Sequence, residues 1–468
     1  MANPAAFAQL SATEMQRAFS TGDLSPVEVA HACLASIRRH DDAINACVRL
    51  SPDAAIAAAE HSAERHRRGQ PLGPLDGVPV AIKDMFLTRG EANLKGSLTV
   101  DPDQPWLQDA PAVAALRRQG AVFIARTTTP EFGWKGVTDS PLTGITRNPW
   151  NPDLTAGGSS GGSAAAIAAG MTPLALGTDA GGSIRIPASF CGIVGLKPTH
   201  GLAPMWPPSA FYPLAHVGPM AWTVRDCALL LDALATPDPR DSTLPAPQDR
   251  FVDGLQAGAD GLRIAWSADL GFVTVDPEVA ALTEAAVELL ADQGALVEHA
   301  DPGFEDPREA FDTLFFAGAA NALRDLGSEA RSRMDPGLTE AVARAEPLSA
   351  LDYLAAMNAR AALSEQMGRF HARWDLLVTP TLPLVAFTAG REVPEHSPDP
   401  RWPGWTPFTY PFNLTGQPAI TVPCGLTRAG LPVGLQIVGP RHADARVLQA
   451  AHALQQAMPL THLRPTMR

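Results

Sequence analysis

A chain of 468 residues with 46% hydrophobic and 18% charged residues has the composition of a large globular protein, not of a disordered one. Its net charge of −13, without any lysine- and arginine-rich stripe, argues against nucleic acid or an anionic membrane as a partner. Its five cysteines are scattered without a CxxC pair, which is typical of reduced thiols in a cytoplasmic protein. The sequence shows no signal-peptide pattern. It also shows no apolar run of roughly 20 residues, which is the length that a membrane-spanning helix needs.

The first 70 residues are predicted to be helical. Two segments, Ser11–Glu14 and Ser25–Glu28, have the capping-box pattern, in which a serine and a glutamate satisfy free N–H groups at a helix start. Farther along, residues 77–82 form an apolar strand, 113–120 a helix and 121–125 a second strand. A strand, a helix and a strand in succession indicate a largely parallel sheet with helices on both faces.

The rest of the chain continues this alternation of strands and helices. Further strands are predicted at 174–176, 262–266, 295–297, 375–378, 419–422 and 434–438. Residues 236–260 are rich in proline and aspartate and are expected to form a surface excursion, whereas 303–370 has a helical pattern. Because the chain has neither an internal repeat nor a flexible linker, we expect one large α/β domain.

Two glycine-rich segments, 157–163 and 177–185, carry most of the chemical signal. Such turns often bind phosphate, but no lysine follows either one as a Walker loop requires, and neither fits the Rossmann pattern. Glycines that only permit tight turns remain the structural alternative. Against it, Ser159 and Ser183 are each flanked by glycines, and few side chains shield the N–H groups of residues 180–183. A run of free N–H groups suits a developing oxyanion.

An upstream lysine, Lys83, ends the first apolar strand. A lysine in that position more often forms a salt bridge or extends its amine to solvent. Burial would instead disfavour the charged form, and a neutral amine accepts a proton. With the two serines, Lys83 would supply the parts of an acyl-transfer site that uses neither histidine nor cysteine.

Other catalytic patterns are absent from the sequence. It contains no GxSxG nucleophile elbow, no HExxH motif and no clustered metal ligands, so we expect neither a metal nor a cofactor. His200 and His216 follow the second glycine-rich segment, and Cys191 lies eight residues after Ser183. Ordinary structural roles are expected for all three.

These segments resemble those of the amidase signature family. The resemblance rests on Lys83, 157–163 and 177–187, and it extends to 73–79, 146–152, 190–199 and 413–419. It implies an α/β fold, as a large single domain with a central mixed, mostly parallel twisted β-sheet covered by helices on both faces. The implied parts of 1–468 are N-terminal helices in 1–70, a signature core in 71–235, a variable, mostly helical substrate-side region in 236–400, and C-terminal strands and a helix in 401–468.

The resemblance also implies a role for each motif residue. Ser183 is the expected nucleophile and Lys83 the expected base. Ser159, which precedes Ser183 by 24 residues and follows a cis peptide after Gly158, would bridge them. The N–H groups expected to form the oxyanion hole belong to Ala180, Gly181, Gly182 and Ser183. The residues expected to support the site are Asp179 and Arg185, as a buried ion pair, and Ser160, in contact with Lys83.

The implied function is that of a serine amidohydrolase that cleaves a carboxylic amide through an acyl-enzyme. The alternative is the glutaminase (A-type) subunit of a tRNA-dependent amidotransferase. Such subunits generally carry a glutamine after the arginine of the nucleophile loop, where this chain has Ile186, and residues 131–138 are bulkier here. A stand-alone hydrolase, monomeric or homodimeric, is therefore favoured. A catalytically inactive binding protein is disfavoured because all three catalytic positions are filled.

Aromatic residues are the candidates for the walls of a substrate pocket, with packing in the core as the alternative for each. The aromatic candidates are Trp134, Trp206, Phe211, Tyr212 and Tyr410, with Trp402, Trp405 and Phe408 in the same late patch as Tyr410, and two small residues near Trp134, Gly136 and Thr138, are further candidates. Apolar walls predict a small-molecule substrate with a hydrophobic or aryl amide, and esters and carbamates (urethanes) are further candidates. A glutamine-like carboxylate would instead favour an arginine clamp.

Overall fold

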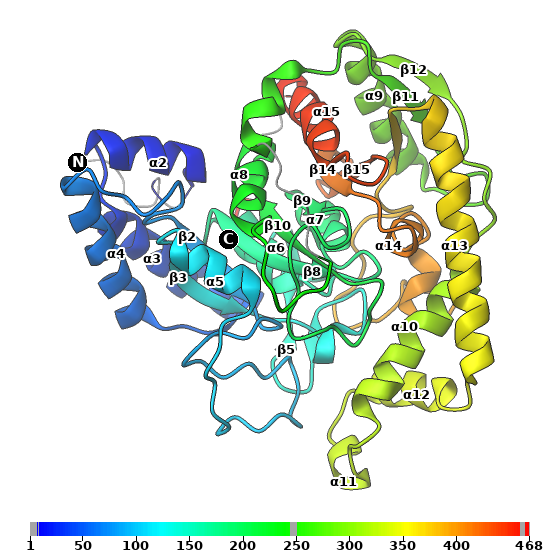
Figure 1. Cartoon of the computed structure of the whole chain (residues 1–468), viewed down its shortest axis with the longest axis horizontal. Coiled ribbons are helices and arrows are strands. Elements are labelled where there is room, and N and C mark those ends of the chain that lie inside the picture. Colours follow the sequence, from blue (N-terminus) through cyan, green and yellow to red (C-terminus); the bar gives the residue numbers. More distant parts are fainter. Residues whose placement is uncertain (1–6, 8, 244–249, 459–463, 468) are drawn as a thin grey trace.

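The computed structural model describes residues 7, 9–243, 250–458 and 464–467. Within these ranges one sheet of 11 strands runs through the molecule, in the order β1-β3-β2-β8-β10-β9-β14-β15-β13-β11-β12 (Figure 1). Its strands are β1 (Cys47–Arg49), β2 (Pro79–Lys83), β3 (Val122–Thr127), β8 (Leu174–Asp179), β9 (Val194–Lys197), β10 (His216–Ala221), β11 (Arg263–Trp266), β12 (Leu296–His299), β13 (Leu376–Pro380), β14 (Ala419–Leu426) and β15 (Pro432–Val438). Two small hairpins are β4 (Asp139–Ser140) with β5 (Gly144–Ile145), and β6 (Arg147–Asn148) with β7 (Asn151–Thr155).

The predicted mixed sheet covered by helices is confirmed. Parallel neighbours form two blocks, β3-β2-β8 and β13-β11-β12, and the strands between these blocks pair antiparallel. Parallel pairing needs a crossover, which α5 (Pro111–Arg118) supplies between β2 and β3. The short turn 427–431 instead makes β14 and β15 an antiparallel hairpin.

The helices lie around this sheet and at both ends of the molecule (Figure 1). Besides α5 they are α2 (Ala12–Thr21), α3 (Pro26–Ile44), α4 (Pro52–Arg67), α6 (Gly161–Ala168), α7 (Arg185–Cys191), α8 (Val224–Leu234), α9 (Pro277–Asp292), α10 (Arg308–Leu323), α11 (Ser328–Arg331), α12 (Pro336–Ala345), α13 (Ala350–Arg373), α14 (Pro411–Leu414) and α15 (Asp444–Ala457). Three short 3-10 helices are η1 (Glu131–Gly133), η2 (Phe251–Ala257) and η3 (Trp402–Trp405). No helix in the described ranges is both long and apolar enough to span a membrane.

Local patterns set the helix starts as predicted. Ser11 and Ser25 each accept a backbone N–H of the first turn, while Glu14 and Glu28 accept the N–H of the cap residue, so both capping boxes are confirmed. The helical pattern over 303–370 corresponds to α10–α13. The predicted excursion over 236–260 contains η2, and its residues 244–249 lie outside the described residues.

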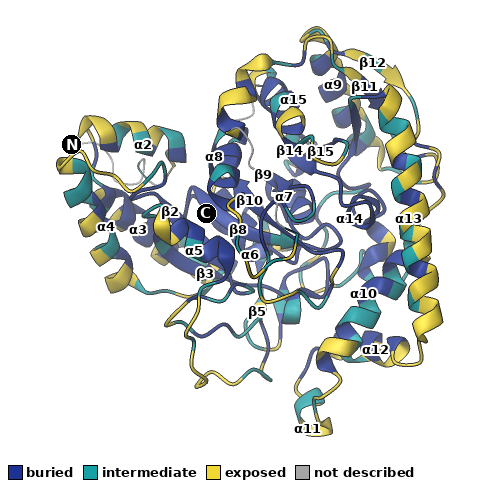
Figure 2. Cartoon of the chain, viewed as in Figure 1, coloured by how far each residue is buried: buried dark blue, intermediate teal, exposed yellow. Residues whose placement is uncertain are grey.

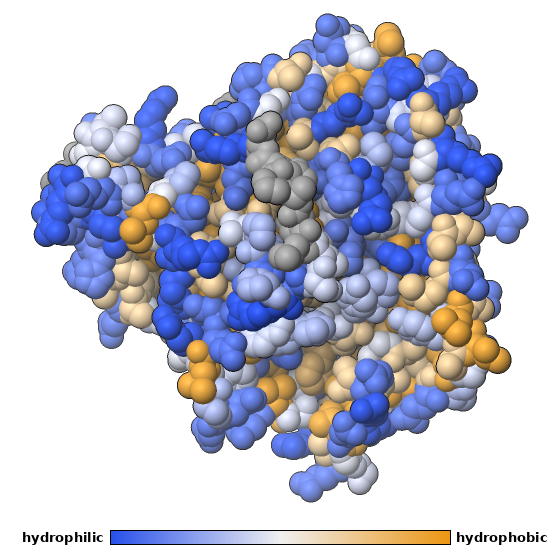
Figure 3. All heavy atoms as spheres, in the orientation of Figure 1, coloured by the Kyte–Doolittle hydropathy of each residue, from blue (hydrophilic) through white to orange (hydrophobic). Residues whose placement is uncertain are grey.

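Two buried apolar clusters surround the sheet. The larger one fills the space between the sheet and helices such as α3, α8 and α15, and most of the strands in the middle of the molecule are buried (Figure 2). The second is aromatic and joins Trp134, Phe311, Trp402 and Tyr410 under α10, α12 and α13. The face drawn in Figure 3 is mostly hydrophilic, with apolar residues grouped chiefly in its lower half. That the whole chain forms one large domain stays a prediction.

Candidate active site

The predicted site residues lie at one edge of the sheet. Lys83 is the last residue of β2, and Thr178 is the next-to-last residue of β8. These strands are parallel neighbours, so their carboxyl ends meet at the same edge. Ser159 and Ser160 immediately precede α6, and Ser183 lies in the turn between β8 and α7. The fold therefore brings both glycine-rich segments to the end of the lysine strand.

The Lys83 side chain is completely buried and is surrounded by hydroxyl groups. Its Nζ lies 2.7 Å from Oγ of Ser159, 2.9 Å from Oγ of Ser160 and 2.8 Å from Oγ1 of Thr178. Among the described residues these three hydroxyls are its only hydrogen-bond partners. Burial lowers the pKa of Lys83 well below its usual value, and the charge of Asp179 offsets only part of this effect. Burial therefore favours the neutral form of this amine over the charged form.

The two serines before α6 are fixed by the backbone around them. The Gly158–Ser159 peptide bond is cis, as the resemblance implied. A Cβ on Gly158 would lie 2.5 Å from the backbone carbon of Val137, so only glycine fits at this position. The Ser160 hydroxyl donates to the carbonyl of Thr178, and its N–H donates to the carbonyl of Ser183 at 3.0 Å. This last bond ties the two glycine-rich segments together.

The predicted ion pair between Asp179 and Arg185 is present, and both side chains are 0% exposed. Two guanidinium nitrogens lie 3.0 Å from the two carboxylate oxygens. Arg185 also donates to Asn413 at 2.6 Å, and to Gln436 and the Thr409 carbonyl. Burial alone would raise the pKa of Asp179, but the charge and hydrogen bonds of Arg185 outweigh it and hold that pKa below its usual range.

The predicted oxyanion hole requires one correction. The Gly182 N–H donates to Oδ1 of Asp179 at 2.8 Å, so the ion pair already occupies this donor. Within the described part of the chain, the N–H groups of Ala180, Gly181 and Ser183 have no such acceptor. Ala180 and Ser183 also line the adjacent cavity, whereas Gly181 does not.

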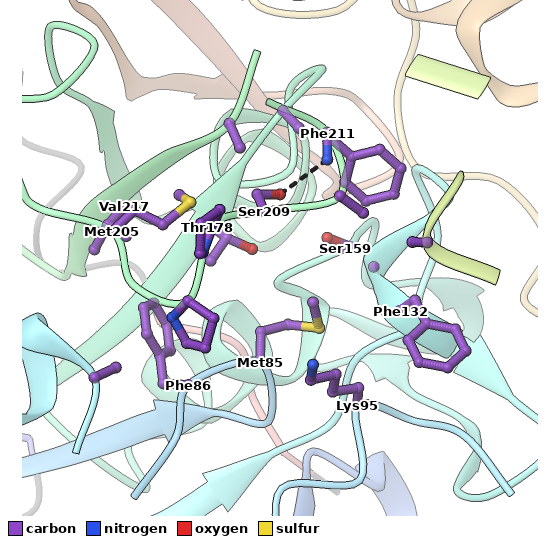
Figure 4. A pocket seen from close by; sticks show the side chains of 18 of the residues that line it. Met85, Phe86, Lys95, Phe132, Ser159, Thr178, Met205, Ser209, Phe211 and Val217 are labelled. Carbon is purple, nitrogen blue, oxygen red and sulfur yellow. Dashed lines mark hydrogen bonds between the residues drawn. The ribbon is translucent and has the colours of Figure 1, made fainter. Parts of the chain in front are cut away.

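A cavity of about 460 Å³ opens beside Ser159, Thr178 and Ser183 (Figure 4). Its other walls are largely apolar, and Met85, Phe86, Phe132, Met205 and Val217 are among them. The sequence analysis did not single out these residues. Met85 and Phe86 could have been found, because they follow Lys83 by two and three residues and therefore leave β2 at the same edge of the sheet.

Only some of the aromatic candidates line this cavity. Trp134, Trp206 and Phe211 do. Tyr410 is instead buried in the aromatic cluster, where its hydroxyl donates to Asp306 at 2.5 Å and its ring stacks on Phe311. The Tyr212 side chain is 53% exposed.

Two further candidates support the backbone near the cavity instead of lining it. Gly136 faces the rings of Trp402 and Trp405, which are core residues like Phe408. Thr138 accepts the N–H of Gly161 at 3.1 Å, at the start of α6. His200, His216 and Cys191 are also absent from the walls.

Comparisons with known proteins agree with the resemblance. A family model described as Amidase matches residues 28–448. The chain is 37% identical over 464 residues to an acylamidase of Rhodococcus erythropolis, with 97% of each chain covered. It is 36% identical over 479 residues to the A-type subunit of a glutamyl-tRNA(Gln) amidotransferase from Chloroflexus aurantiacus, with 96% of each covered. Among solved structures it is similar to a bacterial aryl acylamidase of the amidase signature enzymes, with a TM-score of 0.89, 31% identity and 96% of each chain covered.

Replacing Arg185 by methionine is expected to lower the free energy of unfolding by about 3–5 kcal/mol, because Asp179 then remains as an unpaired buried charge. The exposed pair of Arg263 and Asp375 provides a matched control, and Arg263→Met should cost less than about 1 kcal/mol. Urea denaturation followed by circular dichroism measures both. Equal losses for the two variants would show that the buried pair does not stabilise the fold.

Proposed function

Because the chain belongs to the amidase family, and is therefore a hydrolase of carbon–nitrogen bonds in non-peptide amides, we propose that it acts through Ser183, Ser159 and Lys83. The observation that carries this proposal is the buried lysine whose amine contacts three hydroxyls and, among the described residues, no carboxylate. In this proposal Ser183 attacks the amide carbonyl and forms an acyl-enzyme, which water then hydrolyses.

A neutral amine, which has two N–H donors and one lone pair, can make all three contacts of Lys83. The Ser160 hydroxyl donates its own hydrogen to the carbonyl of Thr178, so it accepts an N–H from the lysine. A second N–H donates to the hydroxyl of Thr178. The lone pair is then left for the hydroxyl of Ser159, which lies 2.7 Å away. A neutral Lys83 can therefore accept the Ser159 proton.

The proton relay follows from this arrangement. Lys83 takes the hydroxyl proton of Ser159 while Ser159 takes that of Ser183, whose oxygen attacks the carbonyl carbon. The oxygen of the tetrahedral intermediate is stabilised by the N–H groups of Ala180, Gly181 and Ser183. When the carbon–nitrogen bond breaks, the relayed proton goes to the departing amine. Water repeats the attack on the ester, and the regenerated Ser183 and a carboxylic acid result.

The cavity favours an amide with a hydrophobic or aryl group. Phe86, Phe132 and Phe211 supply apolar surface beside the serines, which suits such a group. Burying one hydrophobic or aryl group against these walls contributes about 2–3 kcal/mol to the free energy of binding. Esters and carbamates of the same shape are further candidate substrates, because the same acyl-enzyme forms from them.

The alternative function, as the glutaminase subunit of an amidotransferase, is raised by the relatives with that name. The residue after Arg185 opposes it: Ile186 is completely buried and packs on Gly182 and Gly157, where it offers no polar group to glutamine. We therefore propose a stand-alone amidase.

Replacing Ser183 by alanine is expected to lower kcat by a factor on the order of 10⁴–10⁶, because the attacking oxygen is lost. Ser209→Ala is the matched control, since Ser209 also lines the cavity but lies outside the proposed relay. Activity is measured with an anilide, and intact-protein mass spectrometry with an aryl carbamate should show one acyl adduct on the wild type and none on Ser183→Ala. Substantial hydrolysis by Ser183→Ala would refute the assigned nucleophile.

The rate should fall on the acid side of the pH profile, because the relay needs the neutral form of Lys83. Burial lowers the pKa of this lysine, so the neutral form persists to lower pH than in an ordinary lysine and is lost as the pH falls through that pKa. We expect kcat/KM to drop about tenfold per pH unit below it. Lys83→Arg, which stays charged, should be inactive throughout. A rate that climbs only near the ordinary lysine pKa of about 10.4 would contradict a neutral base.

Aryl and alkyl amides are expected to exceed glutamine in kcat/KM by about 30-fold or more, which corresponds to about 2 kcal/mol of apolar burial. Aniline or ammonia release measures this preference on the isolated chain. Glutamine is also tested with added purified amidotransferase partner subunits. Ammonia release from glutamine only in their presence would favour the amidotransferase function.

A further inference from the structure

A second lysine, Lys95, lines the same cavity on the side formed by Met85 and Phe132. In Figure 4 its amine is directed into the space in front of Met85, with the Phe132 ring to one side. A cation is unusual on an apolar cavity wall, because desolvation disfavours its charge unless a counter-ion compensates. Lys95 plays no part in the proposed proton relay.

The Lys95 amine has no acceptor among the described residues, neither a carboxylate nor a hydroxyl or carbonyl group. Asp84 is the carboxylate whose charge reaches it, but Asp84 is already paired with Arg126 at 2.9 Å, and both of these side chains are only 3% exposed. The protein therefore leaves the charge of Lys95 uncompensated at the cavity. Burial lowers the pKa of Lys95, and a bound anion would restore it.

The backbone holds Lys95 firmly in this place. Its carbonyl accepts the N–H of Phe132 at 2.7 Å, and Ser97 donates to Glu131 at 2.6 Å, so the segment is fastened to η1 at two points. A Cβ on Gly96 would lie 2.5 Å from the carbonyl oxygen of Thr129, which shows how closely the two segments pack. Lys95 itself has a φ of 54°, a left-handed conformation that non-glycine residues seldom adopt.

A neighbouring wall residue also has an unused polar atom. Asn93 is 0% exposed, and its amide nitrogen donates to the carbonyl of Asp84 at 2.7 Å, which fixes its orientation. Its Oδ1 has no hydrogen-bond donor within the described ranges, although it is buried. The cavity wall thus contains one donor without an acceptor and one acceptor without a donor, as a polar group of a ligand would require.

We propose that Lys95 binds a carboxylate carried by the substrate, so that the preferred substrates are apolar amides with an acidic group remote from the scissile bond. This proposal rests on the proposed function and narrows its substrate class. The apolar walls strengthen the attraction, because a charge pair interacts more strongly where little water surrounds it. Lys95 is therefore a specificity residue, distinct from the reacting groups.

The test compares matched pairs of anilides. The neutral members are anilides of straight-chain fatty acids, and the anionic members are monoanilides of dicarboxylic acids with the same number of chain carbons. A second set of substrates carries the charge on the amine side of the scissile bond. It compares N-acyl-4-aminobenzoates, which are anionic, with N-acyl-anilines, which are neutral. For wild type we expect at least one anionic substrate to exceed its neutral partner in kcat/KM by about 10–100-fold, mainly through a lower KM.

Lys95→Met, which keeps the length of the side chain but not its charge, should reduce this anionic-to-neutral ratio at least tenfold. Lys95→Arg should retain most of it, and Arg38→Met, which removes an exposed cation on α3, should leave the ratio as in wild type. No anionic preference at any chain length in either set of substrates would overturn the proposal. An equal loss for both substrates in Lys95→Met would also overturn it, because a purely structural role has that effect.

Binding without turnover separates this proposal from the proposed function. Isothermal titration calorimetry on Ser183→Ala, with the same anionic and neutral anilides, measures the charge preference without any chemical step. If the anionic member binds more tightly than the neutral one, and if Lys95→Met abolishes this difference, the Lys95 proposal is supported even if no amide is hydrolysed. Equal binding of both members would refute it, although hydrolysis of neutral anilides would still support the proposed function.

Discussion

The buried ion pair of Asp179 and Arg185 connects the candidate active site to the rest of the fold. Asp179 accepts the N–H of Gly182 and so shapes the turn that contains Ser183, while Arg185 reaches Asn413 of α14 and Gln436 of β15. Both charges are fully buried, so neither is tolerable without the other. Segments that lie more than 220 residues apart in the chain are thereby held as one unit around the turn that contains Ser183.

Three cations near the site differ chiefly in their partners, and the partners decide what each one does. Arg185 is paired with the carboxylate of Asp179, which makes it a structural anchor. Lys83 faces only hydroxyls among the described residues and is buried, which lowers its pKa and suits it to the proposed role as a base. Lys95 has no partner in the described chain and borders the cavity, so its charge is left for a ligand. The same physical quantity, the cost of an uncompensated buried charge, underlies all three roles.

Local features of the fold were predictable and long-range ones were not. The capping boxes at Ser11 and Ser25 need only neighbouring residues, and the sequence identifies them directly. Strand β10 was missed because Gly218 and Pro219 oppose a strand assignment, yet it lies between β8 and β9 in the middle of the sheet. Its place is set by tertiary packing, as is the antiparallel middle of the sheet. The pairing of strands that are distant in the chain cannot be recognised from a short window of sequence.

For the candidate site, the sequence by itself determined the chemistry that is proposed. Ser159, Ser183 and Lys83 stand in short motifs whose glycines permit a single close-packed backbone arrangement, and the structure brings these residues to one edge of the sheet. Only the tertiary structure decided which side chains surround them. Tyr410 turned into the core while Lys95 turned to the cavity, since a side chain's direction depends on what distant segments pack against it. Motif residues are specified by local backbone geometry, whereas the walls that select a substrate are specified by contacts that exist only after folding.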